Sequence, residues 1–270
     1  MANDREVYIL KKIQTEKRVK VAELAEELQV TPETIRKDLT ELEERRLLKR
    51  VHGGAVVPSY FKSSEPAYDD RSEMQIAAKR RIAAEVANDI LPGETLLIDN
   101  GSTIYELAKA ISSIPQLTII TPSLKIAMLF LKNPSAKVFL LGGWLRFTEP
   151  STFGDVTINQ LKGFHVNKTI LSVAGLSAEY GLTEYLEEDA AIKRQALQCG
   201  EKKIVLIDQT KLDVTALLTV APIEQVDQIY VDGCDTDPRI CAIREKGIHV
   251  ICIPHTSGTQ NTVAEDCPQN

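Results

Sequence analysis

The residues most suited to chemistry lie where short apolar runs end. Asp99, Asn100, Gly101, Ser102 and Thr103 directly follow the apolar run 95–98 and precede a helical pattern. A glycine and two hydroxyl residues at a helix N-terminus offer backbone N–H groups, short donors and the positive end of the helix dipole, which suit a phosphate. The same residues also fit an ordinary N-cap, in which Ser102 or Thr103 serves only its own helix.

Further candidate residues follow later apolar runs, or lie in the turn predicted at 181–183 and the helix after it. They are Gly175, Thr183, Glu187, Lys193, Asp208 and Lys211. Lys211 can supply a point charge to a phosphate. Singly, each residue is explained by a glycine turn, by paired helix charges or by a solvated lysine. Together, polar groups at neighbouring strand ends favour a small-ligand pocket.

The elements that must position these residues alternate along the chain. Apolar runs typical of strands occupy 95–98, 117–120, 138–141, 169–173, 204–207, 228–231 and 249–253. Helical patterns separate most of them, near 82–90, 103–111, 124–131, 187–198 and 238–246. Continuously apolar strands that alternate with helices predict a mostly parallel sheet covered on both faces. Such sheets bind ligands at the carboxyl ends of their strands, where the polar residues fall.

The beginning of the chain has the pattern of a small helical module. Residues 21–28 place apolar side chains at the i, i+3, i+4, i+7 spacing of a buried helix face. Thr31 has the type and position of an N-cap before Pro32, and residues 35–42 continue a buried face in the next helix. Two short helices joined by a tight turn describe a helix-turn-helix, whose second helix enters the major groove. A helical protein-interaction module without DNA contact would show the same spacing.

A basic hairpin is predicted after these helices. Strand patterns at 47–51 and 55–57 flank His52 and a Gly-Gly pair, and the pair suits a hairpin turn. The hairpin would carry Lys49, Arg50 and His52 toward DNA, next to a run of basic residues that begins at Arg45 and Arg46. Residues 1–57 hold 12 basic and 11 acidic side chains, net +1, and the remainder holds 20 and 27, net −7. The acidic remainder would be repelled by a nucleic acid backbone, so we expect DNA contact only in the first part.

The composition excludes several classes of protein. With 270 residues, 43% hydrophobic and 26% charged, the chain is typical of about two globular domains. It contains no run of ~18 apolar residues and begins without an apolar signal core, so we expect a cytoplasmic protein with no membrane span. The five cysteines are odd in number and form no C-x-x-C, so we expect reduced thiols, no metal site and no cofactor.

Two segments near the N-terminus carry a family resemblance. Val30-Thr-Pro-Glu-Thr-Ile-Arg-Lys-Asp-Leu39, followed by Leu47-Leu-Lys-Arg-Val-His-Gly-Gly-Ala55, closely resembles the winged helix-turn-helix of the DeoR family of bacterial transcription regulators. The resemblance implies that Thr34, Arg36 and Lys37 face the DNA groove. It also implies that Arg50 and His52 hold the phosphate backbone. Thr31, which begins the same helix, is a further DNA-binding candidate.

The chain from there to about residue 253 resembles the sensor domain of the same family, which is similar in fold to ribose-5-phosphate isomerase. The resemblance rests on residues 99–103, 141–143, 181–194 and 208–211. It implies a phosphorylated sugar or related metabolite as the effector. The phosphate would be held by Gly101, Ser102, Thr103 and Lys211, and the sugar would lie near Asp99, Glu187, Lys193 and Asp208. Gly175 and Thr183 complete the set of effector-binding candidates.

Two residues depart from the family pattern. The family usually has Asn at the positions occupied here by Pro122 and Ala174. Two missing amides remove donors and acceptors that could read sugar hydroxyls. We therefore expect an effector that differs from that of typical members.

The predicted fold class is α/β, in which a winged helix-turn-helix (1–57) precedes a linker (58–75), a mostly parallel α/β sensor domain (76–254) and a disordered tail (255–270). The predicted function is a repressor of a carbohydrate-metabolism operon, a homodimer or homotetramer that binds operator DNA under control of a phosphorylated sugar. One alternative is a sugar-phosphate isomerase-like enzyme with an added DNA-binding module. Because Ser172-Val173-Ala174-Gly175 lacks the acids that the related isomerases carry, no catalytic residue is predicted. Another alternative is a regulator that responds to a protein partner.

Overall fold

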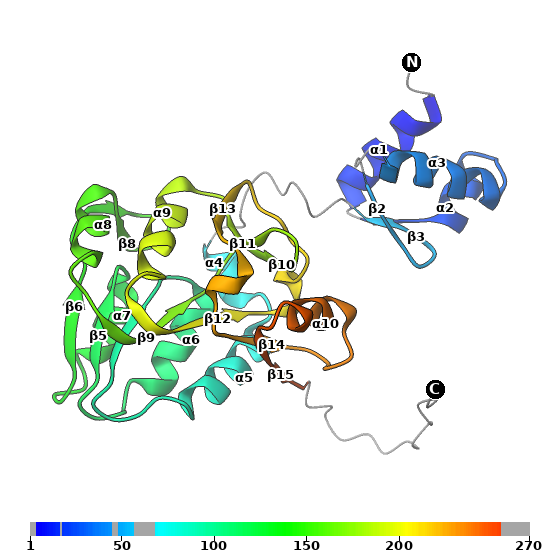
Figure 1. Cartoon of the computed structure of the whole chain (residues 1–270). Helices are drawn as coiled ribbons and strands as arrows, with labels where there is room; N and C mark the ends of the chain where they lie inside the picture. The colour runs from blue at the N-terminus through cyan, green and yellow to red at the C-terminus, as the bar shows by residue number, and fades with distance from the viewer. Residues whose placement is uncertain (1–3, 17, 45–47, 57–67, 255–270) are drawn as a thin grey trace. The chain divides into compact units, whose positions relative to one another are not determined.

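The computed structural model describes residues 4–16, 18–44, 48–56 and 68–254 (Figure 1). The chain divides into two compact units, residues 1–63 and 64–270, and each is described by itself. The predicted tail, residues 58–67 of the predicted linker, and Arg45 and Arg46 of the basic run lie outside the described residues.

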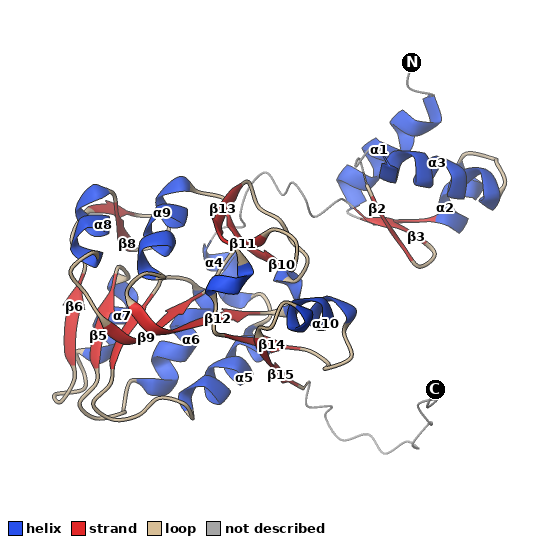
Figure 2. Cartoon of the chain, viewed as in Figure 1, coloured by secondary structure: helices blue, strands red, loops and turns tan. Residues whose placement is uncertain are grey.

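The first unit combines three helices with a small antiparallel sheet (Figure 2). Its elements are α1 (Asp4–Glu16), β1 (Arg18–Lys20), α2 (Val21–Glu27), α3 (Pro32–Glu44), β2 (Lys49–Val51) and β3 (Gly54–Val56), with strand order β1-β3-β2. The apolar stripes meet in one core, in which Leu24, Ile35 and Leu39 have no exposed surface. The predicted helix-turn-helix and hairpin are thereby confirmed.

The strand β1 was not predicted, because only Val19 of its three residues is buried and so short a pattern has no period. It lies close against the hairpin, with Val19 opposite Ala55. A Cβ on Gly54 would lie 2.0 Å from the carbonyl oxygen of Val19. Glycine at position 54 is therefore what allows the third strand to pair.

The second unit is built on a seven-stranded parallel sheet of order β15-β14-β12-β9-β4-β5-β6. The strands are β4 (Thr95–Ile98), β5 (Thr118–Thr121), β6 (Lys137–Leu140), β9 (Val166–Leu171), β12 (Gly200–Ile207), β14 (Gln228–Asp232) and β15 (His249–Ile253). The predicted mostly parallel sheet is confirmed. Every strand ends at the same edge, which we call the carboxyl edge.

Helices cover both faces of this sheet, because successive side chains of a strand point to opposite faces and a continuously apolar strand therefore makes both faces apolar. One face packs on α5 (Ile76–Ala87), α6 (Ser102–Ile111) and α7 (Leu124–Phe130), and the other on α8 (Asp155–Leu161), α9 (Glu187–Ala196) and α10 (Pro238–Glu245). Within β4, Leu96 and Ile98 face the first layer and Leu97 faces the second. The two cores hold the strand ends, and the loops after them, in fixed positions.

Several short elements at the carboxyl edge were not predicted. They are α4 (Tyr68–Glu73), β7 (Trp144–Arg146), β8 (Ser151–Phe153), β10 (Gly175–Ser177), β11 (Gly181–Glu184) and β13 (Leu218–Ala221). The prediction of a turn at 181–183 was wrong, because these residues form β11, the middle strand of a sheet β10-β11-β13. Residues 68–73 are helical, although they lack the apolar period that reveals a helix; among the side chains of α4 that the structure describes, only Tyr68 is buried.

None of the helices in the described part of the chain has both the length and the apolar character to cross a bilayer. Within the same residues, no group of three His, Cys, Asp or Glu side chains is arranged to hold a metal ion.

Candidate functional site

The first turn of α3 is stabilised by its own threonines. The Thr31 hydroxyl accepts the backbone N–H of Thr34 at 3.2 Å, which confirms Thr31 as the N-cap. The two threonine hydroxyl oxygens lie 2.9 Å apart. This end of the helix is therefore preformed, with short polar side chains at the N-terminal turn that a major groove would receive.

Two cations follow on the exposed face of α3. The side chains of Arg36 and Lys37 are 53% and 79% exposed. Arg36 pairs with Glu33 at 2.6 Å, and Lys37 with Glu41 at 3.9 Å. Exposed ion pairs within one helix contribute little to stability, so phosphate groups can replace the glutamates.

The hairpin is tied to α3 beside these cations. The backbone N–H of Arg50 donates to Glu43 at 2.7 Å, and its guanidinium donates to the hydroxyl of Thr40 at 2.9 Å. A hollow of about 560 Å³ is lined by Glu33, Thr34, Arg36, Lys37, Thr40 and Arg50. The structure thus brings four of the six predicted DNA-binding residues to one concave surface. His52 is exposed in the hairpin turn.

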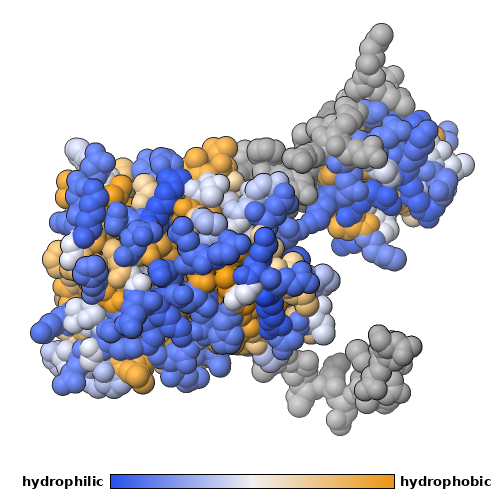
Figure 3. Space-filling model, viewed as in Figure 1, coloured by the Kyte–Doolittle hydropathy of each residue, from blue (hydrophilic) through white to orange (hydrophobic). Residues whose placement is uncertain are grey.

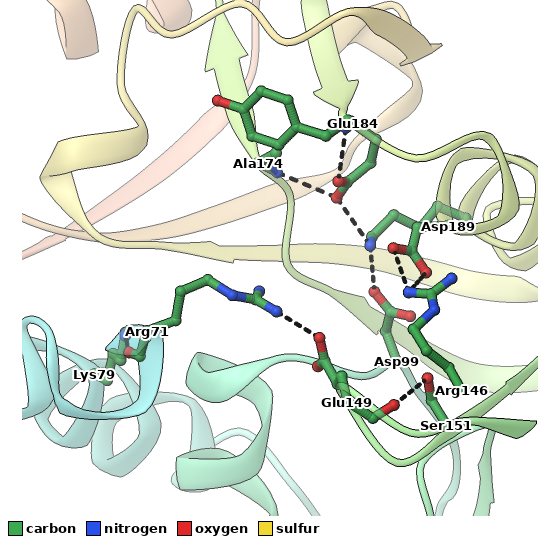
Figure 4. Close-up of polar contacts among 11 residues, drawn as sticks. Arg71, Lys79, Asp99, Arg146, Glu149, Ser151, Ala174, Glu184 and Asp189 are labelled. Carbon is green, nitrogen blue, oxygen red and sulfur yellow. Dashed lines mark hydrogen bonds and ion pairs between the residues drawn. The ribbon is translucent and has the colours of Figure 1, made fainter. Parts of the chain in front are cut away.

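At the carboxyl edge of the second unit, Lys193 joins the carboxylates of Asp99 and Glu184. Both acids are labelled in Figure 4. The Nζ of Lys193 lies 3.2 Å from Asp99, at the end of β4, and 2.9 Å from Glu184, at the end of β11. All three side chains are buried. Glu184 also accepts the backbone N–H of Ala174 at 3.2 Å. The lysine of α9 therefore holds the ends of two different sheets together.

Burial and charge act against each other in this cluster. Burial raises the pKa of Asp99 to about 6, although the charge of Lys193 opposes the rise. Burial also opposes the charge on Lys193, but Asp99, Glu184 and Asp189 outweigh it and hold the pKa of Lys193 well above its usual value. A buried carboxylate with a pKa near neutrality is a feature of binding and catalytic sites.

A second ion pair lies beside the first (Figure 4). One guanidinium nitrogen of Arg146, on β7, lies 3.0 and 2.9 Å from the two carboxylate oxygens of Asp189, in the first turn of α9. Although burial opposes it, Asp189 raises the pKa of Arg146. The pair fixes the hairpin β7–β8 over the first turn of α9.

The phosphate candidates after β4 have the expected backbone geometry. Gly101 is the N-cap of α6 with φ of +120°, a conformation that favours glycine. Because a glycine has no side chain to cap the helix, the first N–H groups of α6 are available to an anion. Ser102 and Thr103 form the first helical positions and are mostly buried.

The candidates after β12 are positioned by a short 3-10 helix, Gln209–Lys211. Asp208 starts it and accepts the backbone N–H of Thr210 at 3.0 Å. Lys211 is half-buried at its end. Asp208 and Lys211 both act on the pKa of Lys79 in α5, which places that buried lysine in the same electrostatic environment.

Three of the residues predicted to bind the effector make contacts outside the Lys193 cluster. The Glu187 side chain is 62% exposed and pairs with Arg194 at 2.9 Å, outside the Lys193 cluster. The buried Thr183 hydroxyl donates to the carbonyl of Gly175 at 3.1 Å and accepts the N–H of Ala216 at 2.9 Å. A Cβ on Gly175 would lie 2.2 Å from the Val214 carbonyl oxygen. Thr183 and Gly175 therefore hold the small sheet together.

Sequence reasoning missed several charged residues of the carboxyl edge. They are Arg71, Lys79, Arg146, Glu149, Glu184 and Asp189. Arg71 and Arg146 belong to short elements, and Glu149 to the loop between β7 and β8, and none of these segments has a period that reveals it. Glu184 and Asp189 flank the predicted Glu187, and the acids alone do not show which of them points inward.

Comparison with known proteins gives consistent matches over both units. Residues 5–61 match the family described as DeoR-like helix-turn-helix domain, and residues 74–233 match DeoR C terminal sensor domain. The chain is 33% identical over 215 residues to the glycerol-3-phosphate regulon repressor of Escherichia coli (strain K12), covering 80% of this chain and 84% of that protein. It is 28% identical over 255 residues to the HTH-type transcriptional repressor GlcR of Bacillus subtilis (strain 168), covering 94% and 98%.

Solved structures resemble the chain only in part. Ribose 5 phosphate isomerase A from Neisseria gonorrhoeae superimposes with a TM-score of 0.37 and 15% identity over 55% of each chain.

Proposed function

Because this chain belongs to the DeoR family of bacterial transcriptional regulators, we propose that it represses a carbohydrate-metabolism operon and that a phosphorylated sugar or related metabolite controls its binding to operator DNA. The observation that carries the proposal is the presence of two preformed sites on one chain. One is the basic hollow of α3 and the hairpin, and the other is the charged carboxyl edge of the parallel sheet.

The DNA-binding half is supported by the side chains that α3 and β2 bring together. Thr34, Arg36 and Lys37 lie on the exposed face of α3, and Arg50 lies beside them on the hairpin. Side chains of these types contact base edges and phosphates in DNA complexes. We assign direct DNA contact to these four residues and backbone contact to His52 at the hairpin turn. Thr31 acts by fixing the helix start.

The effector half is supported by the order of the strands. β9 lies between β12 and β4, so the loops after β4 and β12 are two strand spacings, about 10 Å, apart. We propose that the first turn of α6 holds the phosphate with Gly101, Ser102 and Thr103, while Lys211 adds a positive charge from the other side. Asp99, Lys193 and Asp208 are then placed to contact the sugar.

The effector of this chain is proposed to differ from that of typical members, because Pro122 and Ala174 carry no side-chain amide. In the structure the Pro122 carbonyl accepts the N–H of Thr152 at 2.8 Å, and the Ala174 N–H donates to Glu184. Both positions therefore lie in the loops of the carboxyl edge. A double Pro122→Asn/Ala174→Asn variant should change which sugar phosphate binds best; an unchanged order of preference would refute this point.

We propose that the chain binds its ligand without converting it. The relatives are repressors. Three buried acids of the carboxyl edge are held in ion pairs, Asp99 and Glu184 with Lys193 and Asp189 with Arg146, and a carboxylate held in this way is a poor base. The test is an isomerase assay on ribose 5-phosphate. Turnover by the wild type that Asp99→Asn abolishes would establish the enzyme instead.

Two copies are needed to bind two half-sites, and we propose a homodimer or homotetramer that assembles through the second unit. Support comes from exposed large side chains along the end strand β6 and the hairpin β7–β8: Phe139, Leu140, Trp144, Leu145 and Phe147. Apolar surface is visible on the side where β6 and α8 lie (Figure 3). We also propose a cytoplasmic location, because a bacterial repressor must reach the chromosome.

The proposed function is tested by fluorescence anisotropy with labelled DNA from upstream of the chain's own gene. Ribose 5-phosphate, glucose 6-phosphate, fructose 6-phosphate and glycerol 3-phosphate are added in turn, each beside its unphosphorylated counterpart. We expect specific DNA binding, and a rise in the Kd with one phosphorylated compound only. Failure to bind any upstream DNA, or equal release by an unphosphorylated counterpart, would contradict the proposal.

A further inference from the structure

The helix α4 makes an unusual polar contact at the carboxyl edge. Its Arg71 reaches across to Glu149, in the loop between β7 and β8 (Figure 4). The side chains of Arg71 and Glu149 are only 16% and 10% exposed. The loop itself is held by the Ser151 hydroxyl, which donates to the Glu149 carbonyl at 3.0 Å. An ion pair this well covered joins two short elements that otherwise belong to different parts of the unit.

Glu149 is only half satisfied in this pair. Its Oε2 accepts from Arg71, while its Oε1 is buried with no hydrogen bond to the described residues. A buried carboxylate oxygen without a donor is unfavourable, because it has lost its water. A ligand hydroxyl that donates to Oε1 would therefore bind at a place where the protein already needs a donor.

Arg71 can bind a phosphate more strongly than it binds the one carboxylate oxygen of Glu149. A guanidinium presents five N–H donors in a plane, and a phosphate accepts two of them side by side more strongly than a single carboxylate oxygen does. The helix α4 packs against α6, whose first turn we propose as the phosphate site. Arg71 thus comes from a helix that neighbours the proposed phosphate site.

A buried lysine anchors α4 where it is. The Nζ of Lys79 donates to the carbonyls of Arg71 and Met74, the latter at 2.7 Å. Burial lowers the pKa of Lys79, Asp208 opposes this, and Lys211 and Arg71 add to it. Lys211 and Arg71 therefore each repel the charge of Lys79, and an anion bound near these cations would relieve that repulsion.

We propose that Arg71 is an effector-binding residue that exchanges partners: the phosphate of the ligand takes its guanidinium from Glu149, and the released Glu149 carboxylate accepts hydroxyl groups of the sugar. The inference rests on the proposed function, since it needs a phosphorylated ligand. The same exchange gives the ligand a route to the DNA-binding unit. In the sequence α4 is the first helix after the boundary between the two units at residues 63 and 64, so a movement of Arg71 would act on the helix nearest in sequence to that boundary.

The test uses the full chain and isothermal titration with the four sugar phosphates named above and with inorganic phosphate. Arg71→Lys keeps the charge but not the bidentate geometry, and it should weaken sugar-phosphate binding about 10- to 100-fold. Glu149→Gln removes the competitor for Arg71, so inorganic phosphate should bind several-fold more tightly. The matched control is Arg80→Ala, which removes an exposed arginine of α5 paired with Glu106 and should leave both affinities unchanged.

A neutral pair keeps the test valid if Arg71→Lys folds poorly. Arg71→Met/Glu149→Gln removes both charges together, so no unpaired charge is left buried. This variant should bind operator DNA like the wild type, but the ligand concentration needed to release the DNA should be about tenfold higher or more. Wild-type affinity for sugar phosphate in both Arg71 variants would overturn the exchange while leaving the proposed function intact. A wild-type chain that binds none of the sugar phosphates would overturn both.

Discussion

Replacing Asp99 by Asn is predicted to stabilise the folded chain at neutral pH. Burial raises the pKa of this carboxyl from 3.8 to about 6, in spite of Lys193. A group that binds its proton more tightly in the folded state lowers the stability as the pH rises from the unfolded pKa to the folded pKa. A difference of about 2 pKa units between the unfolded and the folded state lowers the free energy of unfolding by up to ~3 kcal/mol above pH 6 and does not change it below about pH 4.

Asparagine removes this titration and keeps the shape of the side chain. Lys193 still has Glu184 at 2.9 Å, so it keeps a carboxylate partner. The free energy of unfolding of Asp99→Asn minus that of the wild type should therefore increase by up to ~3 kcal/mol from pH 4 to pH 6.5, and stay constant above. The same substitution should weaken sugar-phosphate binding, because Asp99 is proposed to contact the sugar. A residue that binds the ligand can be kept for function although it lowers the stability of the fold.

Urea unfolding followed by far-UV circular dichroism at pH 4, 5, 6 and 7.5 measures this difference. Asp155→Asn is the matched control, since Asp155 is an exposed carboxylate in α8 and the chemical change is the same. The control should differ from the wild type by less than ~0.5 kcal/mol at every pH. If Asp99→Asn shows the same difference at all four pH values, or one that decreases as the pH rises, the burial argument for Asp99 is refuted.

Three further variants test the roles of the two units and the proposed subunit interface. Arg36→Ala should raise the Kd for operator DNA by about tenfold and reduce its salt dependence, with sugar-phosphate affinity unchanged by calorimetry; equal loss of both would contradict separate sites. Lys211→Ala should bind DNA normally in an anisotropy titration but need a higher concentration of sugar phosphate for release, and a normal response would remove Lys211 from the phosphate site. Trp144→Ser combined with Phe147→Ser removes side chains that are 75% and 88% exposed, so folding should be preserved while light scattering shows smaller assemblies. An unchanged mass would place the interface elsewhere.

The parallel sheet could be predicted because its strands are buried on both faces. Residues 95–98 and 249–253 were predicted as strands, and they form β4 and β15 with the same bounds. Continuous apolar runs of this kind carry their own signal, since both faces need apolar residues. The N-cap Thr31 was predictable for another local reason, because a hydroxyl before a proline has one obvious partner, the N–H of Thr34.

The partners of the buried charges could not be predicted, because they depend on contacts between distant elements. Glu187 and Glu184 are both near Lys193 in sequence, but Glu187 is the first residue of α9 and points to Arg194. Glu184 lies at the end of β11, which the sequence pattern did not reveal, and it points to Lys193. Which acid faces inward is decided by the pairing of β11 with β10 and β13, a non-local property.

The central claim is that ligand binding at the carboxyl edge and DNA binding at α3 are coupled within one chain. Coupling between two sites is reciprocal, so operator DNA must change the affinity for the ligand by the same factor by which the ligand changes the affinity for DNA. The direct measurement is calorimetric titration of the chain with the effective sugar phosphate, once alone and once saturated with operator DNA. We predict weaker ligand binding in the complex, by the same factor as the ligand-induced rise in the Kd for DNA. Equal ligand affinity with and without operator DNA would contradict the account.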